Sequence, residues 1–177
     1  TINGTAGSEL LNGTAEADVI NGLEGNDQLV GNGGGDALNG GDGNDWLHAG
    51  AITGEFEQPF FGNNPEFVSP TLDTGAEIDT LNGGAGLDTI FSGYGDIVDG
   101  GADRANLLIS LMGASSGVTV DFRNLDNGGT LNIGGNNISN IQSVTWIEGS
   151  NFADVITGSD QGSTFGLYYA PIFGRGG

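Results

Sequence analysis

A nine-residue pattern repeats five times without a break between residues 4 and 48. Each repeat begins with glycine, carries an acidic residue at its sixth position and places an aliphatic residue at its eighth. The five acids are Glu9, Asp18, Asp27, Asp36 and Asp45. Nine residues are too few for a globular unit with its own core, so each repeat forms only part of a coil in a larger stack.

The two halves of each repeat predict different local structure. The glycine-rich first half allows tight turns with positive φ. The last residues alternate in polarity, as Val19-Ile20-Asn21 does, and predict a short strand with one aliphatic side chain turned inward. Two successive repeats then complete one flattened coil with a strand on each side. Asp18 is therefore expected to stack on Asp36, and Asp27 on Asp45.

Stacked carboxylates repel one another unless a cation lies between them. The other oxygens available in such turns are backbone carbonyls, exposed by the glycine-rich chain. Hard oxygen ligands in an irregular cage suit calcium better than zinc or a soft transition metal. The pattern therefore predicts calcium sites along each stack.

These repeats resemble the RTX (repeats-in-toxin), or haemolysin-type, calcium-binding nonapeptide G-G-x-G-x-D-x-U-x. The best matches are GGDGNDWLH at residues 40–48 and GGAGLDTIF at residues 83–91. The resemblance implies an all-β fold, a right-handed parallel β-roll or β-solenoid, with four to six Ca²⁺ ions in its glycine-rich turns. The side-chain ligands it implies are Glu9, Asp18, Asp27, Asp36, Asp45, Asp79, Asp88, Asp96 and Asp154. The turn residues it implies are Gly22, Gly25, Gly31, Gly33, Gly34, Gly40, Gly41, Gly43, Gly83, Gly84 and Gly86.

Departures from the pattern divide the chain into five expected segments. Residues 1–48 form the first repeat block, in which Glu9 replaces the usual aspartate and Glu16 replaces the fourth-position glycine. Residues 49–73 form an aromatic loop insertion that either contacts a partner or folds back over the roll. Residues 74–108 form the second block, which ends with Ala105 at an acid position. Residues 109–147 are expected to be solenoid spacer strands, longer coils without calcium ligands, and residues 148–177 a degenerate, truncated third block.

Charge and composition limit the partners. The net charge is −20, with three arginines, and this argues against nucleic acid or an anionic membrane as a partner. No apolar stretch is long enough for a transmembrane helix. There is no cysteine, and the single histidine, His48, is expected to face solvent, so no catalytic constellation emerges and the segment is not expected to be an enzyme.

The sequence therefore predicts a calcium-binding segment of a larger secreted or cell-surface bacterial protein. Both chain ends fall inside repeats, which favours a fragment. This calcium-binding segment is expected to fold on calcium binding outside the cell after type I secretion. The alternatives are an accessory domain of a secreted protease, lipase or polysaccharide epimerase or lyase, and a rigid adhesin or surface-layer segment. Expected partners are calcium, adjoining domains of the parent protein, and glycans or cell-surface components.

Overall fold

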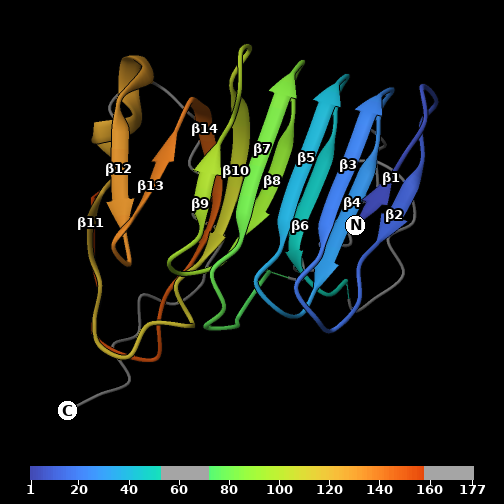
Figure 1. Ribbon diagram of the computed structural model, residues 1–177. Coiled ribbons are helices and arrows are strands. Elements are labelled where there is room, and N and C mark those ends of the chain that lie inside the picture. The colour runs from blue at the N-terminus through green and yellow to red at the C-terminus, as the bar shows by residue number, and fades with distance from the viewer. Residues whose placement is uncertain (53–71, 158–177) are drawn as a thin grey trace, which may run out of the picture.

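The computed structural model describes residues 1–52 and 72–157, and they fold into a β-roll of two facing sheets (Figure 1). The first sheet contains, in spatial order, β1 (Ile2–Asn3), β3 (Val19–Glu24), β5 (Ala37–Asp42), β7 (Thr80–Ala85), β9 (Ile97–Asp99), β13 (Asn136–Ser139) and β12 (Thr130–Ile133). The second contains β14 (Ile141–Glu148), β10 (Ala105–Ser110), β8 (Thr89–Ser92), β6 (Trp46–Gly50), β4 (Gln28–Asn32) and β2 (Leu10–Asn12). A two-stranded sheet of β11 (Thr119–Asp121) and β15 (Val155–Thr157) and the 3-10 helix η1 (Phe122–Gly128) complete it.

Successive repeats alternate between the two sheets. In the first sheet Ile20 pairs with Leu38, and in the second Leu29 pairs with Leu47, both in parallel register. Each strand therefore lies beside the strand two repeats later. The predicted coil of two repeats and the parallel β-roll are confirmed.

The core lies between the sheets, and two rows of inward-facing side chains run through it, supplied by eighth-position residues in the repeats and continued by Ile138 and Val144. In the first sheet the row is Ile20, Leu38, Leu81, Val98 and Ile138, and in the second it is Leu29, Leu47, Ile90, Leu107 and Val144. None of these side chains is more than 4% exposed. Because one repeat contributes only one such side chain, the apolar surface is removed from water only when coils stack.

The insertion leaves the register of the roll unchanged. Asp36 and Asp79, which occupy equivalent positions in neighbouring coils, are 43 residues apart, whereas Asp27 and Asp45 are 18 apart. The 25 extra residues lie in the sequence between β6 and β7. The predicted aromatic loop falls mostly on residues 53–71, which lie outside the described residues, as do residues 158–177 of the expected third block.

Residues 109–147 differ from the expected run of longer coils. β13 and β14 do continue the two sheets in parallel, beside β9 and β10. β12, however, pairs antiparallel with β13 through a two-residue turn at Gly134 and Gly135, whose φ values are 65° and 94°. Two central residues with positive φ define the turn type that joins tight hairpins, so this glycine pair reverses the chain instead of continuing the coil.

The expectation that His48 faces solvent is wrong. His48 is 1% exposed, and its ring stacks on that of Phe91 with centroids 4.1 Å apart and planes 16° apart. Phe91 belongs to an apolar cluster with Leu72 and Leu108, against which Trp46 packs. Burial lowers the pKa of His48 to about 4, so the ring is neutral at pH 7.

Candidate metal centre

The sixth-position acids form two stacks, one along each row of turns. The first stack contains Asp18, Asp36, Asp79 and Asp96, and the second contains Glu9, Asp27, Asp45 and Asp88. At every step the backbone N–H of one acid donates to Oδ1 of the acid in the next coil, over 2.6–3.0 Å. The predicted stacking of Asp18 on Asp36 and of Asp27 on Asp45 is confirmed.

The second oxygen of four of these acids has no partner. Oδ2 of Asp27, Asp36, Asp45 and Asp88 is buried and accepts no hydrogen bond within the described residues. A buried carboxylate oxygen left without a donor is costly, and most such atoms in proteins are satisfied by a donor, a water or an ion. These four oxygens are therefore candidate metal ligands.

The first-position glycines make room for these oxygens. A Cβ on Gly22, Gly31, Gly40 or Gly83 would overlap Oδ2 of the acid five residues later. The same Cβ on Gly22 would also overlap the carbonyl oxygen of Gly40 in the next coil. The first residue of such a repeat must therefore be glycine, because a carboxylate oxygen and a carbonyl oxygen occupy the space that a Cβ would fill.

The second and fourth positions of the turns are left-handed. Gly25, Gly34, Gly43 and Gly86 at fourth positions have φ between 97° and 136°, and Gly41 and Gly84 at second positions have φ of 113° and 106°. Glycine adopts these angles without the steric cost that a Cβ imposes. The predicted residue Gly33 differs, because a Cβ there would lie 3.8 Å from its nearest neighbour.

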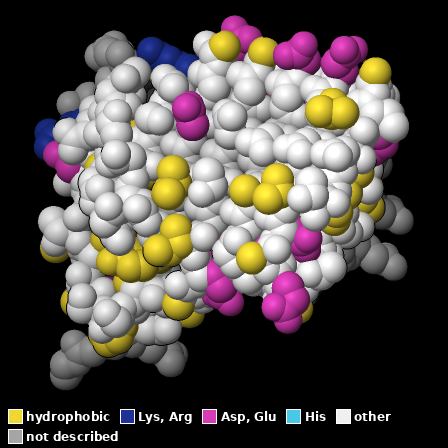
Figure 2. All heavy atoms as spheres, viewed as in Figure 1, with side chains coloured by type: hydrophobic (Ala, Val, Ile, Leu, Met, Phe, Trp, Pro, Cys, Tyr) yellow, Lys and Arg dark blue, Asp and Glu magenta, His cyan; other side chains and the backbone are white. Residues whose placement is uncertain are grey.

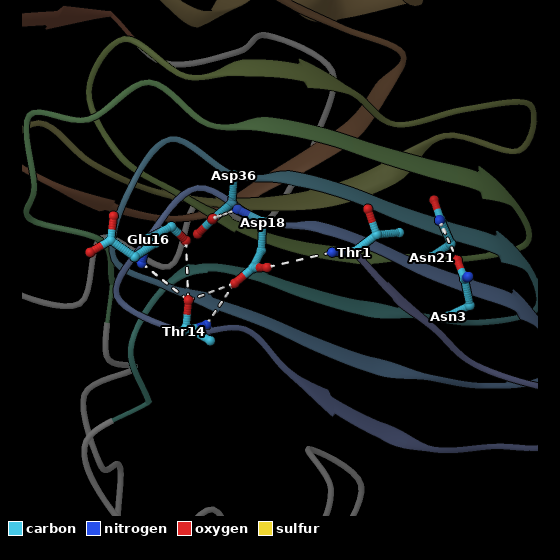
Figure 3. Close-up of polar contacts among 7 residues, drawn as sticks. All are labelled: Thr1, Asn3, Thr14, Glu16, Asp18, Asn21 and Asp36. Carbon is cyan, nitrogen blue, oxygen red and sulfur yellow. Dashed lines mark hydrogen bonds and ion pairs between the residues drawn. The ribbon is translucent and has the colours of Figure 1, made fainter.

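Three turns carry a hydroxyl residue at the second position and hold their acid differently. Thr14 donates through both N–H and Oγ1 to Oδ2 of Asp18, over 2.9 and 2.8 Å, as Figure 3 shows. Thr5 holds Glu9 in the same way. Hydrogen bonds from these threonines lower the pKa of both acids. Positive φ is recorded at neither the second nor the fourth position of these two turns.

The predicted acid of the third block, Asp154, also lies in a hydroxyl-capped turn. Ser150 donates to both of its oxygens, each over 2.7 Å. Oδ1 also accepts the N–H of Val118 over 2.8 Å, one coil earlier. The coil that contains β15 therefore stacks on β11 through the same contact that joins the repeat acids.

Burial and nearby negative charges raise the pKa of Asp36, Asp45, Asp79, Asp88 and Asp96. Burial is the main cause for Asp45, whose pKa rises to about 6, with the charges of Asp88 and Asp27 adding to it. Burial likewise raises the pKa of Asp79 to about 7 and that of Asp96 to about 6. The pKa values of Asp36 and Asp88 are also raised by burial. Without a cation, these stacks resist full ionisation.

One acid outside the repeat register joins the first stack. Asp73, Asp79 and Asp96 each offer an oxygen, and these oxygens lie within 4.8 Å of one another. Asp79 and Asp96 were predicted as ligands, but Asp73 belongs to no repeat and its sequence context carries no signal. Only the path of the chain brings it to the stack.

The surface around the turns is acidic as well. In Figure 2 acidic side chains gather along the upper edge of the roll, while most of the face below them is white. The exposed acids at third and fourth positions of the turns include Glu16, Glu24, Asp42, Glu77 and Asp103. Within residues 1–52 and 72–157 no helix is long and apolar enough to cross a membrane.

Comparison with known proteins agrees with this geometry. The family model of the RTX calcium-binding nonapeptide repeat (4 copies) matches residues 3–38, 30–51 and 73–104. A search of the curated proteins and of the solved structures gives no match. The matched segments contain every acid of the two stacks. In these segments, residues 3–51 and 73–104, the chain carries RTX calcium-binding nonapeptide repeats.

Proposed function

We propose that pairs of neighbouring acids in each stack hold Ca²⁺ between successive turns. One observation carries the proposal: Oδ2 of Asp27, Asp36, Asp45 and Asp88 is buried with no hydrogen-bond donor. An unsatisfied buried polar group costs about 1–3 kcal/mol, and more when it is charged. A divalent cation removes that cost and the repulsion between neighbouring acids.

The number of ions follows from the number of neighbouring pairs. Each stack of four acids has three adjacent pairs, so the two stacks offer six. In two pairs, Glu9 with Asp27 and Asp18 with Asp36, one acid is already held by a threonine hydroxyl. Four to six calcium ions are therefore proposed, with the threonine-capped pairs the weaker sites. Asp154, capped by Ser150, is proposed as a weak ligand or a structural contact only.

Backbone carbonyls of the glycine-rich turns supply the remaining ligands. Calcium takes six to eight oxygens at about 2.3–2.6 Å, more than two carboxylates provide. A Cβ on Gly43 would overlap the carbonyl oxygen of Gly25, and one on Gly86 would overlap that of Gly43. Turn carbonyls thus converge between coils, and Gly22, Gly25, Gly31, Gly34, Gly40, Gly41, Gly43, Gly83, Gly84 and Gly86 are the residues proposed to provide or to make room for them.

Calcium binding is proposed to be coupled to folding of the chain outside the cell. A site that exists only in the folded state stabilises it by RT ln(1 + [Ca²⁺]/Kd), about 1.4 kcal/mol per site when calcium is tenfold above Kd. Four to six sites then supply several kcal/mol, comparable to the whole stability of a small domain. At submicromolar calcium this contribution vanishes for sites of millimolar affinity. This dependence suits a protein that crosses the cell envelope unfolded, by type I secretion, and folds at millimolar calcium.

The proposed role of the segment is structural, not catalytic. His48 is buried and stacked on Phe91, so it is placed to support the outer face of β6 and β8. A calcium-stiffened roll serves equally as an accessory domain of a secreted enzyme or as a rod in a surface protein. No residue of the described roll favours one of these contexts over the other.

The test is a calcium titration of chelator-treated protein followed by far-UV circular dichroism. We expect little strand signal in excess chelator and a steep, cooperative rise with calcium, because one coil is not stable without its neighbours. Magnesium at the same concentration is the matched control and should give little folding, because it demands a small octahedral site. A full strand signal in chelator would contradict coupled folding, and failure to bind calcium by calorimetry would contradict the metal sites themselves.

A further inference from the structure

Asp73 lies where the inserted segment rejoins the roll. A Cβ on Gly50, the last residue of β6, would lie 3.0 Å from the Cα of Asp73, so the two ends of the insertion meet. Oδ1 of Asp73 accepts the N–H of Gly75 over 2.9 Å, which turns the chain toward Asp79. The position of Asp73 is thus set by the roll itself, at the mouth of the insertion.

The side chain of Asp73 points into the first acid stack. Its Oδ2 is buried, lies against the Cα of Gly93 and accepts no hydrogen bond within the described residues. Asp79 is 2% exposed, and Asp96 is 1% exposed. The N–H of Asp36 occupies one oxygen of Asp79, and no hydrogen bond to its other oxygen is found in the described part of the chain. Asp73 and Asp79 therefore each have one oxygen that accepts no hydrogen bond within the described residues, and one oxygen from each of Asp73, Asp79 and Asp96 lies within 4.8 Å of the others.

No positive side chain balances these three acids among the described residues. The ion pairs found there join Thr1 to Asp18 and Arg123 to Asp121, and neither involves the cluster. The hydrogen bonds that these carboxyl groups accept within the described residues come from backbone N–H groups, those of Gly75, Asp36, Asp79 and Gly93. Three carboxylates with oxygens within 4.8 Å of one another require a cation to remain ionised.

We infer that Asp73, Asp79 and Asp96 form a three-carboxylate calcium site that the nonapeptide repeat alone does not supply. The inference rests on the proposed function, since Asp79 and Asp96 are a neighbouring pair of the first stack. Asp73 adds the ligand that makes this site different. The turn here is broken by the insertion, and the next turn, residues 92–96, is one residue short, because Asp79 and Asp96 are 17 residues apart. A side-chain oxygen from Asp73 replaces oxygens that a regular pair of turns provides.

The charge of the cluster sets its expected rank among the sites. Three ionised carboxylates carry one more negative charge than the two of a regular pair, and the affinity of a calcium site increases with ligand charge. This site should therefore fill first when calcium is added to the folded chain. A calcium ion bound here would also join Asp73, at the end of the insertion, to the two coils that carry Asp79 and Asp96.

The experiment compares three variants of the complete 177-residue chain by calcium calorimetry. Asp73→Asn should weaken the tightest site by roughly 10–100-fold, the range seen when support of a metal ligand is lost. Glu24→Gln, which removes an exposed turn acid, is the matched control and should change nothing. Asp45→Asn should instead affect the second stack. If Asp45→Asn weakens binding and Asp73→Asn does not, the three-carboxylate site is wrong and the proposed function stands. If no variant binds less calcium than the parent chain, both fail.

A second measurement decides the matter without a variant, in case Asp73→Asn does not fold. The amide groups of Gly75 and Gly93 donate to Asp73 and Asp96, over 2.9 and 2.6 Å. When chelator is added stepwise to the calcium-saturated, folded parent chain, the NMR resonances of these two amides should be the last to shift. Shifts at Gly75 and Gly93 that precede those at the amides of Asp27 and Asp45 would overturn the inference.

Discussion

Asp45 accepts the backbone N–H of Asp27 through Oδ1 over 2.8 Å, while its Oδ2 remains buried without a donor. The same carboxylate thus joins two coils and offers an oxygen to the space between them. Because Asp88 makes the equivalent contact to Asp45, the acid in the middle of a stack borders two spaces. An acid at the end of a stack borders only one.

Replacing a middle acid should therefore cost more than replacing an end acid. Asp45 lies between Asp27 and Asp88, whereas Ala105 follows Asp88 in the next coil. With calcium tenfold above Kd, Asp45→Asn should lower the free energy of unfolding by about 2.8 kcal/mol and Asp88→Asn by about 1.4 kcal/mol, two sites against one. Urea unfolding at fixed calcium measures both losses, with Glu24→Gln, at an exposed turn acid, as control. Equal losses for Asp45→Asn and Asp88→Asn would argue against calcium between every neighbouring pair.

Replacement by alanine should destabilise the protein at Gly34 but have little effect at the adjacent Gly33. Gly34 has φ of 97°, and its Cβ would lie 2.7 Å from the backbone of Glu16 and Ala17. Gly34→Ala should lower the free energy of unfolding by at least about 2 kcal/mol, because steric strain and overlap add. Gly33→Ala should change it by no more than about 0.5 kcal/mol, because its Cβ would make only ordinary van der Waals contact with Ala15, at 3.8 Å. Denaturant melts of both variants at saturating calcium check the pair, and similar losses would mean that the turns are not held as described.

One second-position residue should be improved by glycine. Leu23 is 49% exposed and has φ of 84°, an angle that costs a residue with a Cβ about 1–2 kcal/mol. Leu23→Gly should raise the free energy of unfolding by about 1 kcal/mol after the greater chain entropy of glycine is counted. Leu10 is 58% exposed in β2, where no positive φ is recorded, so Leu10→Gly should lower stability. A loss in both variants would show that the left-handed turn carries no strain.

The pH dependence of stability should reverse when calcium is removed. The pKa values of Asp45, Asp79 and Asp96 rise from 3.8 to about 6, about 7 and about 6 in the folded chain. Between pH 4 and 7 the folded state then binds more protons than the unfolded state, so metal-free stability falls as pH rises. With calcium bound the same carboxylates stay ionised, and stability rises over the same window because protons compete with the metal.

The strand signal in far-UV circular dichroism at pH 5 and pH 8 in metal-free buffer checks the first half of this prediction, and melting temperatures at the same two pH values and saturating calcium check the second. The lowered pKa values of Glu9 and Asp18 act in the opposite direction, but only as pH falls below about 4, where those acids protonate. A metal-free protein that is more stable at pH 8 than at pH 5 would contradict the raised pKa values.

The sequence by itself determined the repeating part of the roll. The nine-residue period placed Ile20 and Leu38 inside and predicted that Asp27 stacks on Asp45, both of which the structure confirms. This was possible because each repeat pairs in parallel with the repeats two positions before and after it, so a local period fixes the long-range contact. The glycines at first, second and fourth positions follow from the same period, because each is required by a contact within one coil of itself.

Tertiary structure alone decided what lies outside that period. Asp73 reaches Asp79 and Asp96 only because the insertion returns in register, and nothing near Asp73 in the sequence indicates that path. His48 is buried because Phe91, 43 residues away, stacks on its ring in the neighbouring strand. The hydrogen bonds from Thr5 to Glu9 and from Thr14 to Asp18 are local. Only the structure shows that they distinguish these two acids from Asp27, Asp36, Asp45 and Asp88, whose Oδ2 has no donor. Contacts between residues far apart and out of phase depend on how the whole chain is routed, and a repeat pattern carries no information about that routing.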